Sequence, residues 1–377
     1  MFVESLEVKN FRNYGRAAFA FDPGKNVLYG KNAQGKTNVL EALQVCSTTK
    51  SHRGNHDAEM IRFGKEEAHL RLFYQKHGRR HRIDVHLKKN GKKGAAIDGI
   101  PVKRAAELFG TMHLVSFFPE DLRIIKQSPR DRRRFMDSQL CQLDGLYVAR
   151  LTEYNKIVQQ RNALLKNSHF GENIDNLLDA WDEPMVRCGG YILEKREKFL
   201  SELNEIARES HAALTSGAED LKLIYEPGIR GDAFAKQLLH NREKDRRWKL
   251  TTAGPHRDDF QVLLNGIDIR HFGSQGQQRS AALSLKLSEI EFVRKNTQDT
   301  PVLLLDDVLS ELDSERQTML LRNIRNIQTI LTCTGMDELV EQQFPVDRTF
   351  YIENGAPRVV ETSADLSAPD TEEGDRA

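Results

Sequence analysis

The sequence has few cysteines, and their spacing is not that of metal ligands. The four are scattered without a C-x-x-C pair, so neither a disulfide framework nor a zinc site is predicted. Long hydrophobic runs are also missing, because the strongest, residues 302–305, is far too short to span a bilayer. The first residues lack a basic segment followed by an apolar stretch, so no secretory signal is predicted. We therefore expect a soluble protein in a reducing cytoplasm. The cysteines are Cys46, Cys141, Cys188 and Cys333.

Charge of one sign is not in excess either, since Lys plus Arg is 56 and Asp plus Glu is 55 among 377 residues. Only local clusters can therefore indicate a nucleic-acid partner. Most such clusters are solvated helix faces and turns. Phosphate contacts are the alternative, and internal ion pairs are a third possibility for Arg132–Arg134. The groups are Arg123, Lys126, Arg130, Arg132, Arg133 and Arg134; Lys88, Lys89, Lys92 and Lys93; and Arg242, Lys244, Arg246, Arg247 and Lys249.

Hydrophobic patterning divides the chain into three segments and a tail, and the length allows roughly two domains. Residues 1–118 alternate in the manner of β-strands and contain one predicted helix. Residues 119–250 are charged and helically patterned, which predicts an arm of long antiparallel helical hairpins. Residues 251–362 return to α/β patterning. The acidic tail 363–377, rich in Ser, Pro, Asp and Glu, is expected to be disordered.

Breaks between the helices of the arm are predicted at its few turn-forming residues. Asp144-Gly145 and residues 169–171 are typical of turns. Pro184 and the pair Gly189-Gly190 are expected to interrupt the second half, since both residue types disfavour a helix interior.

The block Gly30-Lys31-Asn32-Ala33-Gln34-Gly35-Lys36-Thr37 matches the phosphate-binding pattern G-x-x-x-x-G-K-[ST] in full. Glycines let backbone N–H groups curl around phosphate oxygens, Lys36 can reach the β- and γ-phosphates, and the Thr37 hydroxyl can hold Mg²⁺. A short apolar strand precedes the block and a helical pattern follows it, as an anion site requires. The sequence therefore predicts an ATP site, with Lys36 also in a catalytic role.

The run Pro301–Asp307 predicts a buried parallel strand that ends in two carboxylates. Asp306 suits the Mg²⁺ shell, and Asp307 is placed to polarise an attacking water. A core strand followed by a helix-capping aspartate is the alternative, which the presence of Lys36 makes weaker.

A second anion site is predicted at Ser274-Gln275-Gly276-Gln277-Gln278, because a Ser and a Gly begin an amphipathic helix there. The order of phosphate loop, helical insertion, this segment, apolar-Asp-Asp strand and the turn Ser310–Asp313 resembles the ABC-type ATPase heads. The resemblance implies a mixed α/β head with an antiparallel β subdomain and an inserted helical-hairpin arm. It also implies that Ser274, with Gly276 and Gln277, contacts ATP held by a second copy, across a two-fold interface.

Within that class the chain is similar to the RecF family of bacterial recombination mediators, related to the SMC and Rad50 heads. The separation of Lys36 and Asp306 is too long for a plain transporter subunit and too short for long coiled-coil arms. The segments that carry the resemblance are Lys9–Tyr14, Gly30–Thr37, Phe118–Leu122, Arg132–Asp137, Gly254–Asp259, Ser274–Gln278 and Leu304–Val308.

The resemblance implies an ATP-dependent homodimer with ATP and Mg²⁺ as cofactors. It implies binding to gapped or single-stranded DNA and junctions, and RecA loading with RecO and RecR in repair, replication restart and the SOS response. ATP hydrolysis is expected to be weak, DNA-stimulated and used as a switch. No base-reading motif is present, so DNA form rather than sequence should be recognised.

Departures from the ABC pattern leave some roles open. Asp307 stands where Glu is usual, and only Thr332 or Thr334 is available in place of the switch histidine, which suggests slow hydrolysis. Residues 116–121 hold no Q-loop glutamine. His256 and Arg257 are either structural or near the nucleotide. A P-loop phosphotransferase and a transporter ATPase subunit are the alternative functions, against which the Ser274 segment and the long insertion argue.

Overall fold

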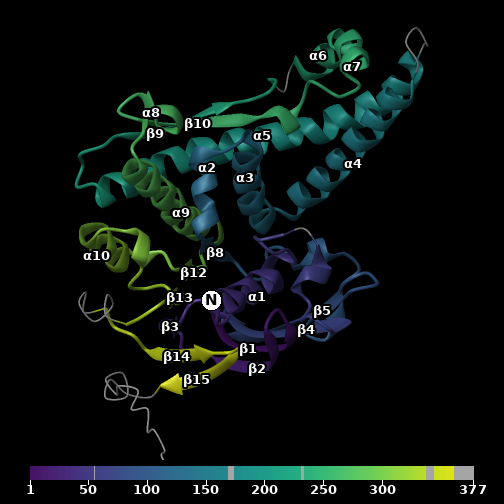
Figure 1. The fold of residues 1–377 in the computed structure, drawn as a ribbon. Coiled ribbons are helices and arrows are strands. Elements are labelled where there is room, and N and C mark those ends of the chain that lie inside the picture. Colours follow the sequence, from purple (N-terminus) through teal and green to yellow (C-terminus); the bar gives the residue numbers. More distant parts are fainter. Residues whose placement is uncertain (55, 169–173, 231–232, 337–343, 361–377) are drawn as a thin grey trace, which may run out of the picture. The chain divides into compact units, whose positions relative to one another are not determined.

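The computed structural model describes residues 1–360 except 55, 169–173, 231–232 and 337–343. The chain forms two compact units (Figure 1), which are considered separately. The first comprises residues 1–108, 114–119 and 300 onward, and the second comprises 109–113 and 120–299. The segment expected at 251–362 is therefore shared between the two units. The predicted disordered tail 363–377 lies outside the described residues.

The first unit contains a six-stranded sheet in the order β15-β14-β3-β13-β12-β8. Its strands pair in parallel except for the hairpin β14–β15. The central strands β12 and β13 are fully buried, which explains their continuous apolar sequences. The strands are β3 (Lys25–Tyr29), β8 (Leu114–Phe117), β12 (Val302–Asp306), β13 (Thr329–Cys333), β14 (Arg348–Glu353) and β15 (Ala356–Val360).

Helix α1 (Lys36–Thr48) contacts this sheet through the buried Val39, Leu40 and Leu43. The other helical elements of the unit are η1 (Asp57–Met60), η2 (Ala105–Leu108), η6 (Leu309–Glu311) and α10 (Ser314–Asn323). Helix η3 (Pro119–Leu122) begins in this unit and continues into the second.

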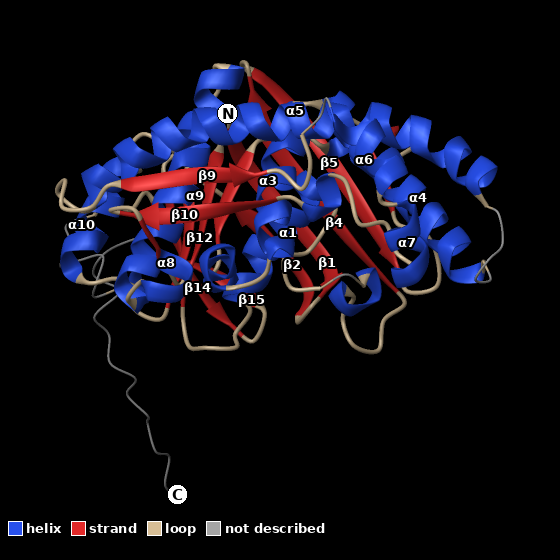
Figure 2. Ribbon diagram, turned by 90° about the horizontal axis from the view of Figure 1, so that it is seen from above, coloured by secondary structure: helices blue, strands red, loops and turns tan. Residues whose placement is uncertain are grey.

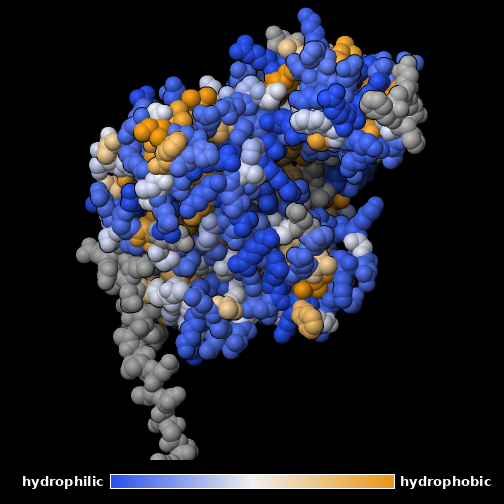
Figure 3. Space-filling model, turned by 45° about the horizontal axis from the view of Figure 1, so that its top comes forward, coloured by the Kyte–Doolittle hydropathy of each residue, from blue (hydrophilic) through white to orange (hydrophobic). Residues whose placement is uncertain are grey.

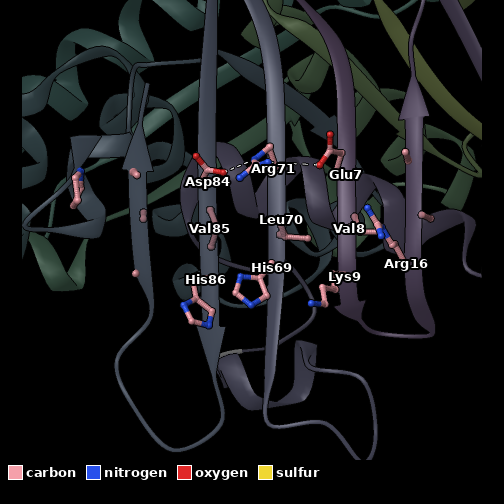
Figure 4. A pocket seen from close by; sticks show the side chains of 16 residues that line it. Glu7, Val8, Lys9, Arg16, His69, Leu70, Arg71, Asp84, Val85 and His86 are labelled. Carbon is pink, nitrogen blue, oxygen red and sulfur yellow. Dashed lines mark hydrogen bonds and ion pairs between the residues drawn. The ribbon is translucent and has the colours of Figure 1, made fainter. Parts of the chain in front are cut away.

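An antiparallel sheet in the order β2-β1-β4-β5-β6-β7 forms the predicted β-rich part. Alternating residues of β4 and β5 are buried, so one face packs inward and the other is open. The open face is hollowed by about 870 Å³ (Figure 4). The strands are β1 (Phe2–Phe11), β2 (Tyr14–Ala20), β4 (Glu67–Lys76), β5 (Arg79–Lys88), β6 (Gly94–Ile97) and β7 (Ile100–Pro101).

The second unit is built on the predicted helical hairpin, in which α4 and α5 run side by side (Figure 1). Asp144 begins α4 as predicted, because its carboxylate accepts the N–H groups of Leu146 and Tyr147. The helices are α2 (Arg123–Lys126), α3 (Pro129–Leu143), α4 (Gly145–Asn167), α5 (Asp175–Leu214), α6 (Phe234–His240), α7 (Arg242–Trp248), α8 (Ile269–Phe272) and α9 (Gln275–Thr297), with η5 at Pro255–Arg257.

The breaks expected at Pro184 and Gly189-Gly190 are wrong, because α5 continues through both for 40 residues, about 60 Å. Gly189 is needed for packing rather than for a turn. A Cβ there would lie 2.4 Å from Phe234 and 3.1 Å from Tyr154. Close packing of α5 against Phe234 and Tyr154 thus outweighs the low helix propensity of Gly189.

Three short strands complete the second unit, and Figure 2 shows two of them, β9 and β10, side by side. They are β9 (Leu221–Glu226), β10 (Asp259–Leu264) and β11 (Ile267–Asp268). Among the described residues no helix is long and apolar enough to cross a membrane. The face in Figure 3 is mostly hydrophilic, with apolar side chains in small groups.

Buried ion pairs join the helices of the second unit. Arg161 on α4 is fully buried and donates to Asp182 on α5 at 2.8 Å and to Asp245 on α7 at 2.7 Å. Its guanidinium also contacts the Thr251 hydroxyl. Removing one partner of such a network leaves an uncompensated buried charge, so these contacts fix how the three helices pack.

Candidate nucleotide-binding site

The phosphate loop connects β3 to α1 in the first unit, as the sequence predicts. Gly30 and Gly35 have φ angles of 138° and 115°, which favour glycine. A Cβ on Gly30 would lie 2.5 Å from the Ile352 carbonyl, and one on Gly35 would lie 2.6 Å from the Asn13 amide. The loop therefore reaches the N-terminus of α1 by a backbone path that only these glycines allow, and that terminus is suited to an anion.

Lys36 folds over its own loop. Its ammonium donates to the carbonyl oxygen of Gly30 and, at 3.0 Å, to that of Lys31. The residue is 8% exposed. Burial lowers the pKa of Lys36, and the carboxylates of Asp307 and Asp306 act in the opposite direction. The site thus holds an ammonium close to the loop on which phosphate oxygens would lie.

The Thr37 hydroxyl and the Asp306 carboxylate are in direct contact. Thr37 Oγ1 donates to Asp306 Oδ1 at 2.8 Å. Thr332 Oγ1, on the neighbouring strand β13, donates to the same oxygen at 2.8 Å, and Asp306 is 5% exposed. These oxygen atoms are of the kind that Mg²⁺ prefers. The structure thus brings together the two predicted Mg²⁺ ligands, Thr37 and Asp306. It also places Thr332 beside them, a residue that the sequence suggested only as a substitute for the switch histidine.

Asp307 directly follows this carboxylate and has a left-handed backbone, with φ 52°. Non-glycine residues adopt this conformation only when their surroundings hold it. The Thr332 hydroxyl accepts the Asp307 N–H at 2.9 Å, and the Asp307 carbonyl accepts from Ser310 at 2.8 Å. Asp307 is therefore held in a fixed turn beside Asp306.

The loop is supported by residues to which the sequence assigned no role. Asn13 donates to the Gln34 carbonyl at 2.8 Å, and the Tyr14 hydroxyl donates to the Gly35 carbonyl at 3.1 Å. The Asn354 N–H donates to the Gln34 side chain at 2.6 Å. The signal for Asn13 and Tyr14 was their segment Lys9–Tyr14, noted only for its family resemblance. No local pattern marks Asn354, which approaches the loop through the β14–β15 hairpin.

An ion pair fixes the helix behind the loop. Arg12 donates to both carboxylate oxygens of Glu41, at 2.8 and 2.6 Å, and to the Glu59 carbonyl at 2.7 Å. Glu41 lies in α1 and is fully buried. Bidentate pairs of this kind are strong and directional. The arginine thus ties β1 to α1 and to η1.

Ser274 begins helix α9 of the second unit. Its hydroxyl accepts the Gln277 N–H at 3.2 Å and the Gln277 side chain accepts the Ser274 N–H at 3.0 Å, which forms a capping box. The side chain of Ser274 is exposed, and a Cβ on Gly276 would meet only the Ser274 hydroxyl, at 3.9 Å. The helix terminus therefore has room for an anion. Ser274 and the phosphate loop belong to different units of this chain.

Glu219 supports the capping box from behind. Its carboxylate accepts from Gln277 Nε2 at 2.9 Å and contacts His211 Nε2 at 3.0 Å. His211 is fully buried in α5, and its other ring nitrogen lies 2.8 Å from the Ser284 hydroxyl in α9. The Glu219 carboxylate thus joins the start of α9 to the end of α5. The sequence did not reveal this contact.

His256 has a structural environment in the second unit. Its ring nitrogens lie 2.7 Å from the Tyr154 hydroxyl and 3.0 Å from the Thr251 carbonyl. Burial lowers the pKa of His256 to about 4, so the ring is neutral at physiological pH. Arg257 also donates to the Thr251 carbonyl, at 3.3 Å. Of the two alternatives for these residues, these contacts favour the structural one.

The basic clusters divide into paired and exposed members. Arg132 is buried and donates to Asp259 at 2.5 and 2.8 Å, while Arg133 donates to the Asp258 carbonyl at 2.6 Å. Arg242 and Arg246 pair with aspartates of α5. Lys93 pairs with Asp57 and Lys89 with Glu66. The exposed members of the first group are Arg123, Lys126, Arg130 and Arg134.

Comparison with known proteins covers almost the whole chain. A family model described as RecF/RecN/SMC N terminal domain matches residues 2–355. The DNA replication and repair protein RecF of Agathobacter rectalis is 50% identical over 361 residues, which are 96% of this chain and 100% of that protein. The protein of the same description from Clostridium botulinum strain Eklund 17B is 41% identical over 360 residues, 94% of this chain and 99% of that protein.

Two solved structures give the same picture at lower identity. The recombination mediator protein RecF with ATP, of the RecFOR pathway, superposes with a TM-score of 0.87 and 33% identity, over 96% of this chain and 98% of that one. An Smc head bound to the C-winged helix domain of ScpA has a TM-score of 0.57 at 16% identity, over 96% and 97% of the two chains. The second likeness shows the fold alone, which is the predicted ABC-type head.

Proposed function

Because this chain belongs to the RecF family of DNA replication and repair proteins, we propose that it binds ATP and DNA and acts as a recombination mediator. The observation that carries the proposal is the Thr37–Asp306 contact, which joins the phosphate loop to the acidic strand within one unit. The likeness to a RecF structure with ATP supports the choice of nucleotide. Family membership also favours this function over the phosphotransferase and the transporter subunit.

The residues present fit Mg²⁺ as a companion of the nucleotide. The Thr37 hydroxyl and Asp306 carboxylate would hold the ion, and Thr332 would keep that carboxylate in orientation from behind. A bound Mg²⁺ supplies positive charge that balances the phosphate oxygens. Lys36 would exchange the carbonyl oxygens of Gly30 and Lys31 for phosphate oxygens, since its ammonium needs acceptors in either state.

Asp307 is the residue proposed to orient the attacking water. Thr332 and Ser310 hold the backbone of its turn, which brings the side chain of Asp307 next to Asp306. Aspartate is one methylene shorter than the usual glutamate, and threonine stands where a switch histidine is usual. Both features favour slow, DNA-stimulated hydrolysis that times release, rather than rapid turnover.

Dimerisation on ATP is proposed through Ser274. Its exposed hydroxyl and the first N–H groups of the 23-residue helix α9 form a terminus suited to phosphate. The phosphate loop already binds the nucleotide from one side. A second copy of the chain would bring its own Ser274, Gly276 and Gln277 to the other side, so that ATP joins the two protomers about a two-fold axis.

The proposed DNA partner is gapped or single-stranded DNA and its junctions with duplex. Arg123, Lys126, Arg130 and Arg134 are exposed and lie on α2 and α3. We propose that they contact phosphates, and because the sequence has no base-reading motif, recognition should follow the form of the DNA. RecR, RecO and RecA are the proposed protein partners, with RecA loading, replication restart and SOS induction as outcomes.

The test is DNA binding and sedimentation with and without ATP and Mg²⁺. We expect ATP to convert monomers to dimers and to tighten binding to gapped DNA more than to duplex DNA. Lys36→Arg should abolish the ATP effect through nucleotide binding, and Ser274→Arg should abolish dimerisation while ATP binding is kept. Intact ATP-dependent dimerisation in Ser274→Arg would show that Ser274 does not act across the interface.

A further inference from the structure

The open face of the antiparallel sheet carries three metal-ligating side chains at one point, away from the phosphate loop residues. His69 on β4 and His86 on β5 are directly opposite in the strand register, and their rings stack at 4.1 Å with an angle of 18°. Figure 4 shows the two imidazoles side by side on neighbouring strands. Glu67, two residues before His69 on the same face of β4, completes the group.

Both imidazoles direct the same nitrogen at one carboxylate. His86 Nε2 lies 2.8 Å from Glu67 Oε2, and His69 Nε2 lies 3.4 Å from Glu67 Oε1. The three donor atoms lie within 4.8 Å of one another. Two imidazole nitrogens and a carboxylate oxygen, with further positions open to water, form a donor set that Zn²⁺ takes at about 2.0–2.2 Å per bond.

We propose that Glu67, His69 and His86 form a Zn²⁺ site that links β4 to β5. Only side-chain rotations would be needed to bring the three atoms around one ion, because the strand register already fixes the backbone. The side chains are 52%, 42% and 32% exposed, respectively, so the ion can enter from solvent and keep water ligands. Cysteine spacing gave no indication of the site, since its ligands are histidines paired across two strands.

Neighbouring charges set the strength of the site. The groups that face it across the sheet are cationic: Lys9 lies opposite His69 on β1, and Lys88 lies opposite Glu67 on β5. Like charges nearby weaken the binding of a cation. We therefore expect a reversible site rather than a permanent structural metal. Its occupancy would stabilise the hairpin of β4 and β5, because a ligand that binds only the folded state favours that state.

The competing explanation is a surface ion cluster in which protonated histidines pair with Glu67 and no metal is bound. Exposed pairs of this kind contribute little to stability. The two explanations differ in what zinc does to the protein. A metal site gives one saturable binding event that depends on all three side chains, whereas an ion cluster gives none.

The test is titration of the full-length, chelator-treated protein with zinc chloride, without nucleotide, in competition with a chromophoric chelator. We expect one equivalent to bind and the thermal midpoint to rise. His86→Gln and Glu67→Gln should each weaken binding at least about tenfold, while Lys88→Gln should tighten it. The control is His81→Gln on the same strand, whose imidazole pairs with Asp98 at 2.9 Å.

Circular dichroism of each metal-free variant establishes that it is folded. Manganese or magnesium chloride serves as the ion control, because hard cations prefer sites richer in oxygen ligands. Equal zinc affinity in His86→Gln and in the wild-type protein would overturn the proposal. Absence of zinc binding in the wild-type protein and in His81→Gln would also overturn it.

Discussion

The hydroxyl of Thr332 lies 2.8 Å from Oδ1 of Asp306, the same carboxylate oxygen that accepts from Thr37. Residues 306 and 332 are direct partners in the register of β12 and β13, so the parallel sheet itself creates the contact. Because Thr332 also accepts the Asp307 N–H, one hydroxyl holds the Asp306 carboxylate and the backbone of Asp307. Thr332, one of the two residues considered for the switch position, thus lies within β13 and contacts Asp306, the proposed metal ligand.

Thr332→Val should weaken ATP binding when Mg²⁺ is limiting. Loss of the hydroxyl leaves the buried Asp306 oxygen and the Asp307 N–H each short of one hydrogen bond, which costs about 1–3 kcal/mol. We expect a higher Mg²⁺ requirement and slower hydrolysis, measured by titrating MgCl₂ at fixed ATP. Thr334→Val is the matched control, since Thr334 is exposed. The reverse ranking of the two variants would move the switch position to residue 334.

Lys36→Ala should weaken ATP binding by about 10- to 100-fold, since a charge-assisted contact is worth about 1.5–3 kcal/mol. The measurement is equilibrium binding of a fluorescent ATP analogue. Lys65→Ala, an exposed lysine outside the loop, should bind as the wild-type protein does. Thermal unfolding without nucleotide should change little, because the loss of two hydrogen bonds is offset by relief of the cost of burying the ammonium.

Neighbouring arginines of one cluster should fall into two classes. Arg132→Ala should destabilise the protein by about 3 kcal/mol, because the partly buried Asp259 carboxylate loses a bidentate partner. Arg130→Ala, at an exposed position of the same helix, should leave stability unchanged and weaken DNA binding, with a salt slope smaller by about one. Urea unfolding and DNA titration at several salt concentrations measure the two effects. If Arg130→Ala keeps the full salt slope, this position of α3 does not contact phosphate.

The sequence predicted those parts of the site that lie in one continuous segment. Gly30–Thr37 and Asp306 have local patterns, because each residue type meets a requirement of its own turn or strand. Thr332 and Asn354 could not be assigned in the same way, since their roles depend on which strands are neighbours. The error at Gly189 has the same origin. Its conformation is set by Phe234 and Tyr154, which are distant in the chain.

The free energy of unfolding should fall as the pH is lowered from about 6.5 to about 4, because His256 stays neutral in the folded protein over this range. The pKa of His256 is about 4 in the folded protein because of burial, below the usual 6.5. The unfolded state therefore binds more protons below about pH 6.5, and the loss reaches about 3 kcal/mol near pH 4. Differential scanning fluorimetry between pH 7.5 and 4.5 should show a smaller loss in His256→Gln. Tyr154→Phe, which keeps the histidine, should retain the wild-type pH dependence.

Glu219→Ala should weaken ATP-dependent dimerisation without affecting ATP binding. The Glu219 carboxylate accepts a hydrogen bond from the Gln277 side chain, which in turn accepts the Ser274 N–H. Without Glu219, the turn at Ser274 is held less firmly in the position proposed to contact the ATP of the second copy. One such hydrogen bond is worth about 1 kcal/mol, which corresponds to about a fivefold change in the dimer dissociation constant. Glu209→Ala, an exposed glutamate of α5, is the control. Sedimentation at several protein concentrations measures dimerisation, and the fluorescent ATP analogue measures binding. Equal losses of dimerisation and of ATP binding in Glu219→Ala would mean that the residue supports folding in general. Loss of dimerisation alone would mean that Glu219 acts through the capping box of Ser274.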